Sequence, residues 1–97
     1  MTKIMKTSKQ QQFPMGEVVA TPGSLEAIPI IEIDAGLKRH RNGDWGEVCA
    51  EDKKANDVSL ANGLRLLSAY RSAAGRVFWI ITEADRSYTT VLLPEEY

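Results

Sequence analysis

The C-terminal third of the chain, residues 76–97, constrains the fold more than any other stretch. Two runs rich in β-branched and aromatic residues, 77–81 and 88–93, lie on either side of the polar corner at residues 84–87. Strand-forming residues around a short polar cluster are typical of a β-hairpin. The chain is therefore expected to build an antiparallel pair of strands here, and the remaining residues have to cover it.

A third strand is predicted directly before this hairpin. Residues 64–71 are rich in leucine and are joined to the next strand, 76–83, by the small polar turn at 72–75. The last strand, 88–93, ends at Pro94, because proline cannot continue a strand ladder. The three strands together predict an antiparallel meander.

The N-terminal half begins with a short strand candidate at residues 16–20. Thr21 or Ser24 can then cap a short helix, since both hydroxyls are good acceptors for the first backbone N–H groups. Leu25 and Ile28 are expected to be the inward residues of that helix.

Pro29 ends this helix, and the stretch after it, 30–42, is ambiguous. Ile31 and Ile33 alternate with acids as in a strand. Three aliphatic residues instead recur with the helical period: Ile30, Ile33 and Leu37. Length and the basic ending favour a helix through about Arg41.

The sequence GDWGE predicts the start of a further helix. Asp44 would accept a hydrogen bond from the backbone N–H of Glu47, and the Glu47 side chain would reach back, as in a capping box. Trp45 and Cys49 are expected to face the core, and Gly63 ends the helix.

These elements define an α+β fold: a short N-terminal strand, two to three helices, and then a three-stranded antiparallel β-meander packed on the helices. Residues 13–97 would form this single domain, and the polar residues 1–12 a disordered tail. The apolar content of 43% and the charged content of 26% fit a globular domain.

The two faces of the meander follow from the alternation of side chains. We place the hairpin tip at residues 85–86 and pair Arg71 with Arg76, which puts Tyr70 and Trp79 on one face. Both faces are then largely apolar, whereas an antiparallel sheet normally leaves one face wet. We expect helices to cover one face, and a helix, a second copy or a partner to cover part of the other.

The candidate binding residues come from this second face and from the polar corner. They are Tyr70, Trp79, Glu83, Asp85, Arg86 and Tyr88. The corner is able to contact a ligand or a partner loop, although turn chemistry alone also explains its residues. Aromatic rings on a sheet face are able to stack on bases, but core or interface packing is their commoner role.

No residue pattern indicates catalysis. Cys49 and His40 are the only cysteine and histidine, and nothing in their spacing makes them a nucleophile and base. His40 is expected to be a capping or surface residue, and Cys49 a small buried one. One cysteine and one histidine cannot supply a zinc site, and no glycine-rich phosphate loop occurs. We therefore expect no catalytic residue, no metal and no cofactor.

The charge distribution bears on partners and location. The net charge is −1, and the only basic excess, three lysines, lies in residues 1–15. This argues against nucleic acid as the partner without excluding it. The longest apolar run, 77–81, is too short to cross a bilayer, so we expect no membrane partner. A single cysteine fits a reducing cytoplasm.

Segments 16–28, 41–63 and 78–97 carry the motifs GDWG, ND, TEADR, TT and LLPEEY. With these motifs the chain resembles a small uncharacterised bacterial family associated with plasmids and other mobile elements. The resemblance covers about residues 13–97. It implies a plasmid-related protein and brings no biochemistry to carry over.

The order of elements is also similar to the RelE-type mRNA interferase toxins, which cut ribosome-bound mRNA with basic side chains and a late tyrosine. That resemblance of topology would give such roles to Arg65, Arg71, Arg76, Arg86 and Tyr88. The toxins are strongly basic, however, and this chain has a pI near 5.8. The sequence favours a non-enzymatic accessory or regulatory protein that acts through protein–protein contacts, with a toxin as the alternative and a small-ligand site under the hairpin as a third possibility.

Overall fold

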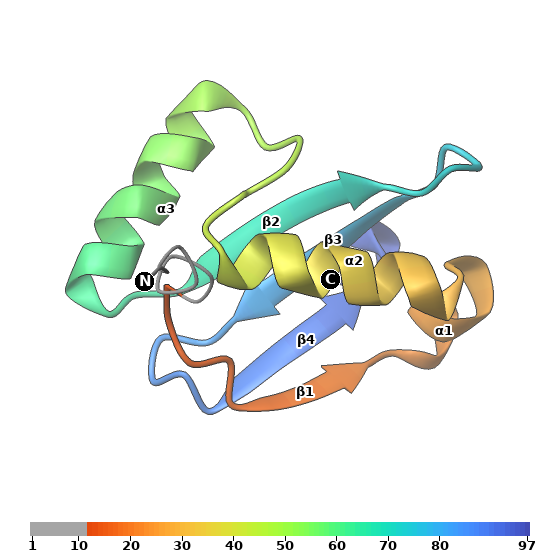
Figure 1. Cartoon of the computed structure of the whole chain (residues 1–97), viewed down its shortest axis with the longest axis horizontal. Helices are drawn as coiled ribbons and strands as arrows, with labels where there is room; N and C mark the ends of the chain where they lie inside the picture. Colours follow the sequence, from red (N-terminus) through yellow and green to blue (C-terminus); the bar gives the residue numbers. More distant parts are fainter. Residues whose placement is uncertain (1–11) are drawn as a thin grey trace, which may run out of the picture.

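The computed structural model describes residues 12–97, which form a sheet with helices along one face and beside one edge (Figure 1). The α+β class, the short N-terminal strand and the helices are confirmed. The elements are β1 (Glu17–Ala20), α1 (Pro22–Ala27), α2 (Ile30–Arg41), α3 (Ala50–Asn62), β2 (Leu66–Arg71), β3 (Val77–Thr82), β4 (Tyr88–Leu92) and the 3-10 turn η2 (Pro94–Glu96). The tail predicted at residues 1–12 lies outside the described residues, apart from Gln12, whose backbone N–H donates to the carbonyl oxygen of Arg41.

The sheet has four strands in the order β1-β4-β3-β2 and is mixed. β2, β3 and β4 form the antiparallel meander that the sequence predicts, but β1 joins it in parallel beside β4. A purely antiparallel, three-stranded sheet is therefore wrong. The backbone groups of β1 need a neighbouring strand, and β4 is the edge of the meander that remains open to it.

The turn between β1 and α1 follows the sequence prediction in part. Thr21 caps α1, because its hydroxyl accepts a hydrogen bond from the Ser24 N–H at 3.1 Å. Ile28 is buried as expected. Leu25 is 52% exposed, so its inward placement is wrong. In this short helix the inner position belongs to Ser24, whose hydroxyl also bonds the carbonyl oxygen of Val91 on β4.

The ambiguous stretch 30–42 is helical, and α2 ends at Arg41 as the basic ending indicates. Its inner face lies on the sheet and includes Ile33 and His40. Ile30, expected on that stripe, is instead 68% exposed. The main core between α1, α2 and the sheet consists of Ile28, Ile33, Tyr70, Phe78, Ile80, Val91 and Leu93.

The segment around Asp44 does not start a helix, which corrects the predicted capping box. α3 begins only at Ala50. The Asp44 carboxylate accepts from the Gly46 N–H at 3.1 Å and not from that of Glu47. Gly46 has a φ of +74°, which is incompatible with a right-handed helix. Trp45 is buried as predicted, whereas Cys49, expected in the core, is exposed.

Residues 45–47 instead run along the outer edge of β2. The N–H of Ala69 donates to the carbonyl oxygen of Trp45 at 3.2 Å, and the N–H of Glu47 donates to the carbonyl oxygen of Ala69 at 2.7 Å. Asn56 of α3 bonds a second residue of this edge. Its side-chain amide donates to the carbonyl oxygen of Leu67 at 2.7 Å and accepts from the Leu67 N–H at 3.1 Å. The edge of β2 is therefore covered by hydrogen-bond partners.

The register between β2 and β3 differs by one residue from the expected pairing. Arg71 lies opposite Val77, not Arg76, and Tyr70 lies opposite Phe78. The loop closes between Ser72 and Arg76, with Gly75 at a φ of +90°, as in a hairpin loop with a glycine bulge. A shift of one residue moves a side chain to the other face. The predicted tip at residues 85–86 between β3 and β4 is confirmed.

Substituting Gly46 tests the closure of the β2 edge. A Cβ at this position would collide with the carbonyl oxygen of Ala69, and the positive φ adds backbone strain. We expect Gly46→Ala to lower the free energy of unfolding by about 2–4 kcal/mol. Gly75→Ala is the matched control: its φ is also positive but its Cβ would meet no atom, so a loss of about 1 kcal/mol is expected. Urea unfolding at pH 7 measures both, and equal losses would contradict the steric closure.

Candidate functional site

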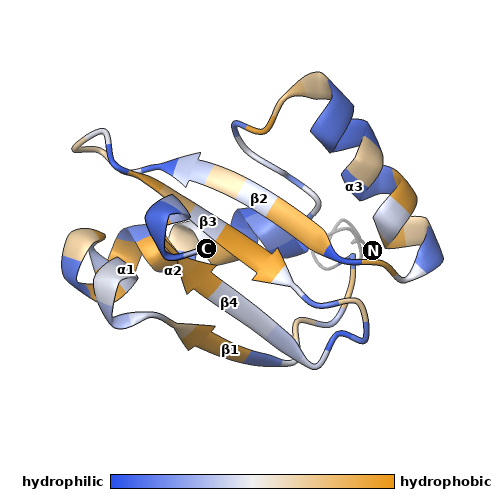
Figure 2. Cartoon of the chain, turned by 180° about the vertical axis from the view of Figure 1, so that it is seen from behind, coloured by the Kyte–Doolittle hydropathy of each residue, from blue (hydrophilic) through white to orange (hydrophobic). Residues whose placement is uncertain are grey.

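The candidate site is the sheet face that α1 and α2 leave uncovered, which we call the open face. Figure 2 shows this face from behind, crossed only by the C-terminal turn. The strand registers place three rows of side chains on it. The rows are Val19, Thr90, Ile81 and Leu67; Leu92, Trp79 and Ala69; and Glu17 with Tyr88.

The middle of the open face is covered by Tyr97. Its ring meets that of Trp79 edge-on, with centroids 5.7 Å apart. Arg65 holds the tyrosine, because its guanidinium lies 5.3 Å from the ring centroid and donates to the Tyr97 hydroxyl at 2.7 Å. Arg65 also lies 3.7 Å from the Glu83 carboxylate. The prediction that something must cover part of this face is thus met by the chain's own last residues.

Part of the open face remains accessible, although Ile81, Leu92 and Ala69 on it are buried. Val19 is 38% exposed, Tyr88 is 48% exposed and Tyr97 is 67% exposed. Trp79 and Thr90 are half-buried beside them. Apolar and aromatic side chains that stay exposed next to one another mark a contact surface rather than a core.

Acidic side chains outnumber basic ones around this face. Arg65 and Arg76 each pair with a carboxylate, from Glu83 and Glu95 respectively. Two further acids flank the face, Glu17 beside Tyr88 and Glu96, whose carboxylate accepts from the Thr21 hydroxyl at 2.6 Å. Four acids against two arginines leave a local charge of −2.

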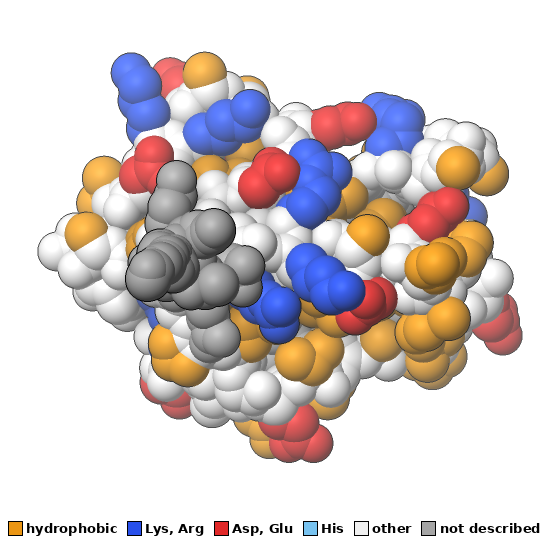
Figure 3. Space-filling view, in the orientation of Figure 1, with side chains coloured by type: hydrophobic (Ala, Val, Ile, Leu, Met, Phe, Trp, Pro, Cys, Tyr) orange, Lys and Arg blue, Asp and Glu red, His pale blue; other side chains and the backbone are white. Residues whose placement is uncertain are grey.

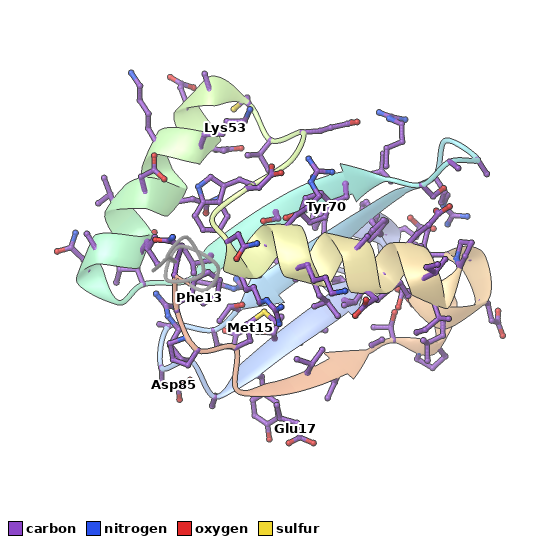
Figure 4. All side chains as sticks on the ribbon, viewed as in Figure 1. Phe13, Met15, Glu17, Lys53, Tyr70 and Asp85 are labelled. Atoms are coloured by element: carbon purple, nitrogen blue, oxygen red, sulfur yellow. The ribbon has the colours of Figure 1, made fainter. Side chains whose placement is uncertain are left out.

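The polar corner after β3 is held by its own hydrogen bonds. Asp85 is exposed at the tip (Figure 4). It accepts from both the N–H and the hydroxyl of Ser87, and these bonds lower the pKa of its carboxyl. Glu83 bonds Tyr88 through its backbone N–H. Turn chemistry therefore accounts for this half of the predicted binding corner.

Arg86 turns away from the open face and braces the interior. Its Nη1 donates to the carbonyl oxygens of Leu64 and Glu83 at 2.6 and 3.0 Å, and its guanidinium lies 5.6 Å from the ring centroid of Phe13. Nη2 reaches the carbonyl oxygen of Ser59 at the end of α3. The side chain joins the hairpin to α3 and to the N-terminal segment, and little of it is available for a partner.

Tyr70 does not lie with Trp79, because the one-residue register shift places it on the helix-covered face. It is 2% exposed and packs against Phe78 under α2 (Figure 4). Its hydroxyl donates to the carbonyl oxygen of Asp44, and burial raises the pKa of the phenol above its ordinary value. Of the predicted site residues, the structure therefore places only Trp79 and Tyr88 on the open face, in rows on either side of Thr90, with Glu83 at its border.

His40 is fully buried, which corrects its prediction as a capping or surface residue. Its Nδ1 lies 2.6 Å from the Ser68 hydroxyl and its Nε2 lies 2.9 Å from the Thr82 hydroxyl. The series of hydrogen bonds continues from the Thr82 hydroxyl to the Thr89 hydroxyl at 2.7 Å, and from the Thr89 hydroxyl to the carbonyl oxygen of Met15 at 2.7 Å. The helical period that places Ile33 on the inner face of α2 also places His40 there, and this signal in the sequence could have found it.

The last hydrogen bond of this series, to the Met15 carbonyl oxygen, decides which group donates in each of the others. Thr89 donates to a carbonyl, so it accepts from Thr82, which in turn accepts from the Nε2–H of His40. Nδ1 is then the acceptor for the Ser68 hydroxyl, and the imidazole is neutral. Ser68 and His40 have the spacing of a nucleophile and base, but both are fully buried and the ring is packed against Phe13. The arrangement joins α2 to the sheet and offers no access to a substrate.

The arginines that a toxin would use are held apart by other partners. Arg65 holds Tyr97, Arg71 pairs with Glu47 at 3.0 Å, Arg76 pairs with Glu95, and Arg86 bonds backbone carbonyls. Arg65 and Arg86 lie near one end of the β2–β3 pair and Arg71 and Arg76 at the other. On the face seen in Figure 3, basic and acidic side chains are interspersed along α2 and do not form one basic surface.

A small cavity of about 220 Å³ lies between α3 and β2. Its lining residues are Asp52, Ala55, Asn56, Ser59, Arg65 and Leu67. Asn56 already uses its side-chain amide on β2, and Arg65 is engaged by Tyr97 and Glu83. Over residues 12–97, no set of three histidine, cysteine or carboxylate side chains is arranged to hold a metal ion. None of the helices described here is long and apolar enough to span a membrane.

Comparisons of the chain with models of protein families, with curated proteins and with solved structures find no match.

The buried histidine predicts a specific pH dependence of stability. Burial, aided by the Arg86 charge, lowers the pKa of His40 from 6.5 to about 4. Between pH 6.5 and 4, His40 is protonated in the unfolded chain but stays neutral in the folded one. The contribution of neutral His40 to the free energy of unfolding is therefore fully present above pH 6.5 and is lost as the pH falls toward 4. We expect a loss of about 3 kcal/mol over that window.

Urea unfolding between pH 7 and pH 4.5 measures this slope. His40→Gln keeps a side chain that can hydrogen-bond but cannot titrate, so its stability should change less over the same window. The lowered carboxyl pKa values of Asp44, Asp85 and Glu96 act at the acid end of this window in both proteins, so the difference between the two slopes isolates His40. Identical slopes for the two proteins would refute the assignment.

The bracing role of Arg86 is tested by Arg86→Ala. Arginine and alanine both carry a Cβ, so the strain at the positive φ of this position is unchanged and only the guanidinium is lost. We expect a decrease of about 2 kcal/mol in the free energy of unfolding. Asp85→Ala at the same turn is the control and should have a smaller effect. Thermal unfolding measures the stability of both variants. A larger loss of stability for Asp85→Ala than for Arg86→Ala would contradict the bracing role of Arg86.

Proposed function

We propose that the chain is a small non-enzymatic accessory protein that acts by binding another protein on its open face. The proposal depends on one observation: exposed apolar and aromatic side chains, including Tyr88, Val19 and Tyr97, lie on a sheet face that α1 and α2 leave uncovered. The plasmid and mobile-element context remains part of this proposal and is supported only by the sequence motifs.

The composition of the open face favours a protein contact. Tyrosine and tryptophan are enriched in the centres of protein–protein interfaces, where they bury a large area at a small entropic cost. Tyr97 and Trp79 are already ordered by their edge-on packing and by the Arg65 bond. A partner would therefore meet a surface that needs little rearrangement.

The charge around the face favours a partner with basic side chains. The acids Glu17 and Glu96 are not neutralised by any ion pair within the described residues, whereas both arginines are paired. Complementary charge speeds association and selects partners. The same charge repels phosphate groups, so it weighs against nucleic acid and against the toxin alternative.

The buried position of His40 also supports binding rather than catalysis. Both of its ring nitrogens are engaged with Ser68 and Thr82, and no solvent reaches it. A general base has to lie within hydrogen-bond reach of a substrate proton.

The test is a charge placed on the open face. Tyr88→Asp puts a carboxylate within the proposed contact, where its desolvation is costly, so binding should weaken by at least about tenfold. The matched control is Val58→Asp, because Val58 is 56% exposed on α3, away from the open face. Affinity capture of the tagged chain from cells that express it naturally, with quantitative mass spectrometry, measures the loss for each captured protein.

The proposal is supported if one protein is captured by the natural chain and by Val58→Asp but not by Tyr88→Asp. It is overturned if Tyr88→Asp captures the same proteins in the same amounts. Growth arrest with cleaved mRNA on expression of the natural chain would replace it with the toxin alternative.

A further inference from the structure

The two edge strands of the sheet differ in whether their outer backbone groups have hydrogen-bond partners. The outer edge of β2 is closed by residues 45–47 and by the Asn56 amide. On the opposite edge, β1 pairs with β4 on one side, and within residues 12–97 no strand pairs with its other side (Figure 1).

The hydrogen bonds of β1 show which of its backbone groups face outward. The N–H groups of Glu17 and Thr21 donate toward β4, to the carbonyl oxygens of Ser87 and Val91 at 2.9 and 3.0 Å. Backbone groups alternate in direction along a strand. The N–H and C=O groups of Val18 and Ala20 therefore point away from the sheet.

Beyond Glu17 at its start, this edge carries no charged side chain, proline or bulge. Exposed edges are usually blocked by a charged side chain, a proline or a bulge. The run Val18-Val19-Ala20 has none of these and pairs in regular register with β4. Its valines are 43% and 38% exposed, one on each face of the sheet.

We propose that β1 pairs antiparallel with β1 of a second copy of this chain, about a two-fold axis that passes through Val19 perpendicular to the sheet. In this register Val18 lies opposite Ala20 of the second copy, and these two residues exchange their outward N–H and C=O groups. Val19 lies opposite Val19 of the second copy on the open face. The two sheets of four strands become one continuous sheet.

A second copy fits this edge because the strand is complementary to itself. The central run Val18-Val19-Ala20 is uncharged, so no like charges meet there, and Glu17 lies opposite Thr21 of the second copy, whose hydroxyl donates to the Glu96 carboxylate. The two Val19 side chains meet each other on the open face, and both open faces lie on the same side. An isologous pair of this kind closes on itself and does not grow into a filament.

The inference concerns the edge and not the face, so it stands whether or not a partner binds on the open face. A single pair of short strands buries a small area, and the dimer is accordingly a weak one, formed at high micromolar concentration.

Sedimentation equilibrium of the full chain tests the dimer. The natural chain should show a reversible monomer–dimer equilibrium. Val18→Pro removes an outward N–H from each copy while sparing the bonds to β4, and it should raise the dissociation constant at least about tenfold. Ile31→Lys, at a 76% exposed position on α2, is the control and should leave the equilibrium unchanged. A natural chain that stays monomeric up to about 1 mM would overturn the proposal.

Disulfide trapping tests the register without relying on the proline variant. In a Cys49→Ser background, Val19→Cys places two thiols in a non-hydrogen-bonded pair, where Cα atoms lie about 4.5 Å apart and a disulfide can form. Val18→Cys faces Ala20 of the second copy and should cross-link much more slowly. Rapid cross-linking of Val19→Cys alone supports the proposal. Equal cross-linking of the two variants, or faster cross-linking of Val18→Cys, overturns it.

Discussion

The hydrogen bonds that close the outer edge of β2 hold together parts of the chain that the rest of the structure depends on. Asn56 bonds the backbone of Leu67, and residues 45–47 bond that of Ala69. The neighbouring Asp57 accepts from the indole N–H of Trp45 at 3.0 Å, which locks the two closing segments to each other. The GDWG and ND motifs are therefore two halves of one structural device, and their residues are explained by backbone hydrogen bonding without any ligand.

The buried chain of hydroxyls around His40 is the second constraint. It links α2 to β2 and β3 through the imidazole and continues through Thr89 to the segment before β1. A buried polar group costs stability unless it is bonded, so each member of the chain requires the next. Helix, sheet and N-terminal segment are thereby fixed in one relative position, with the apolar core of Ile33, Phe78 and Val91 beside them.

Strand composition and turn residues predicted most of the secondary structure, and the length and basic ending of residues 30–42 predicted α2. The errors have specific physical causes. The position of Gly75 in a bulge decided the β2–β3 register and moved Tyr70 away from Trp79. Gly46 at positive φ turned an apparent helix cap into an edge segment. Neither the parallel pairing of β1 nor the cover that Tyr97 gives the open face can be inferred from local pattern, because both depend on contacts between distant residues.

The pairing of β1 with β4 joins the two ends of the described chain. The Thr89 hydroxyl and the Met15 carbonyl that it meets are 74 positions apart, and Thr21 and Glu96 are 75 positions apart. Closing so long a loop has a large entropic cost, whereas the meander closes through short turns. We therefore expect the meander and α2 to assemble first and β1 to be added last. By the same reasoning, we expect β1, whose outer edge is open, to be the first strand to leave the sheet on unfolding.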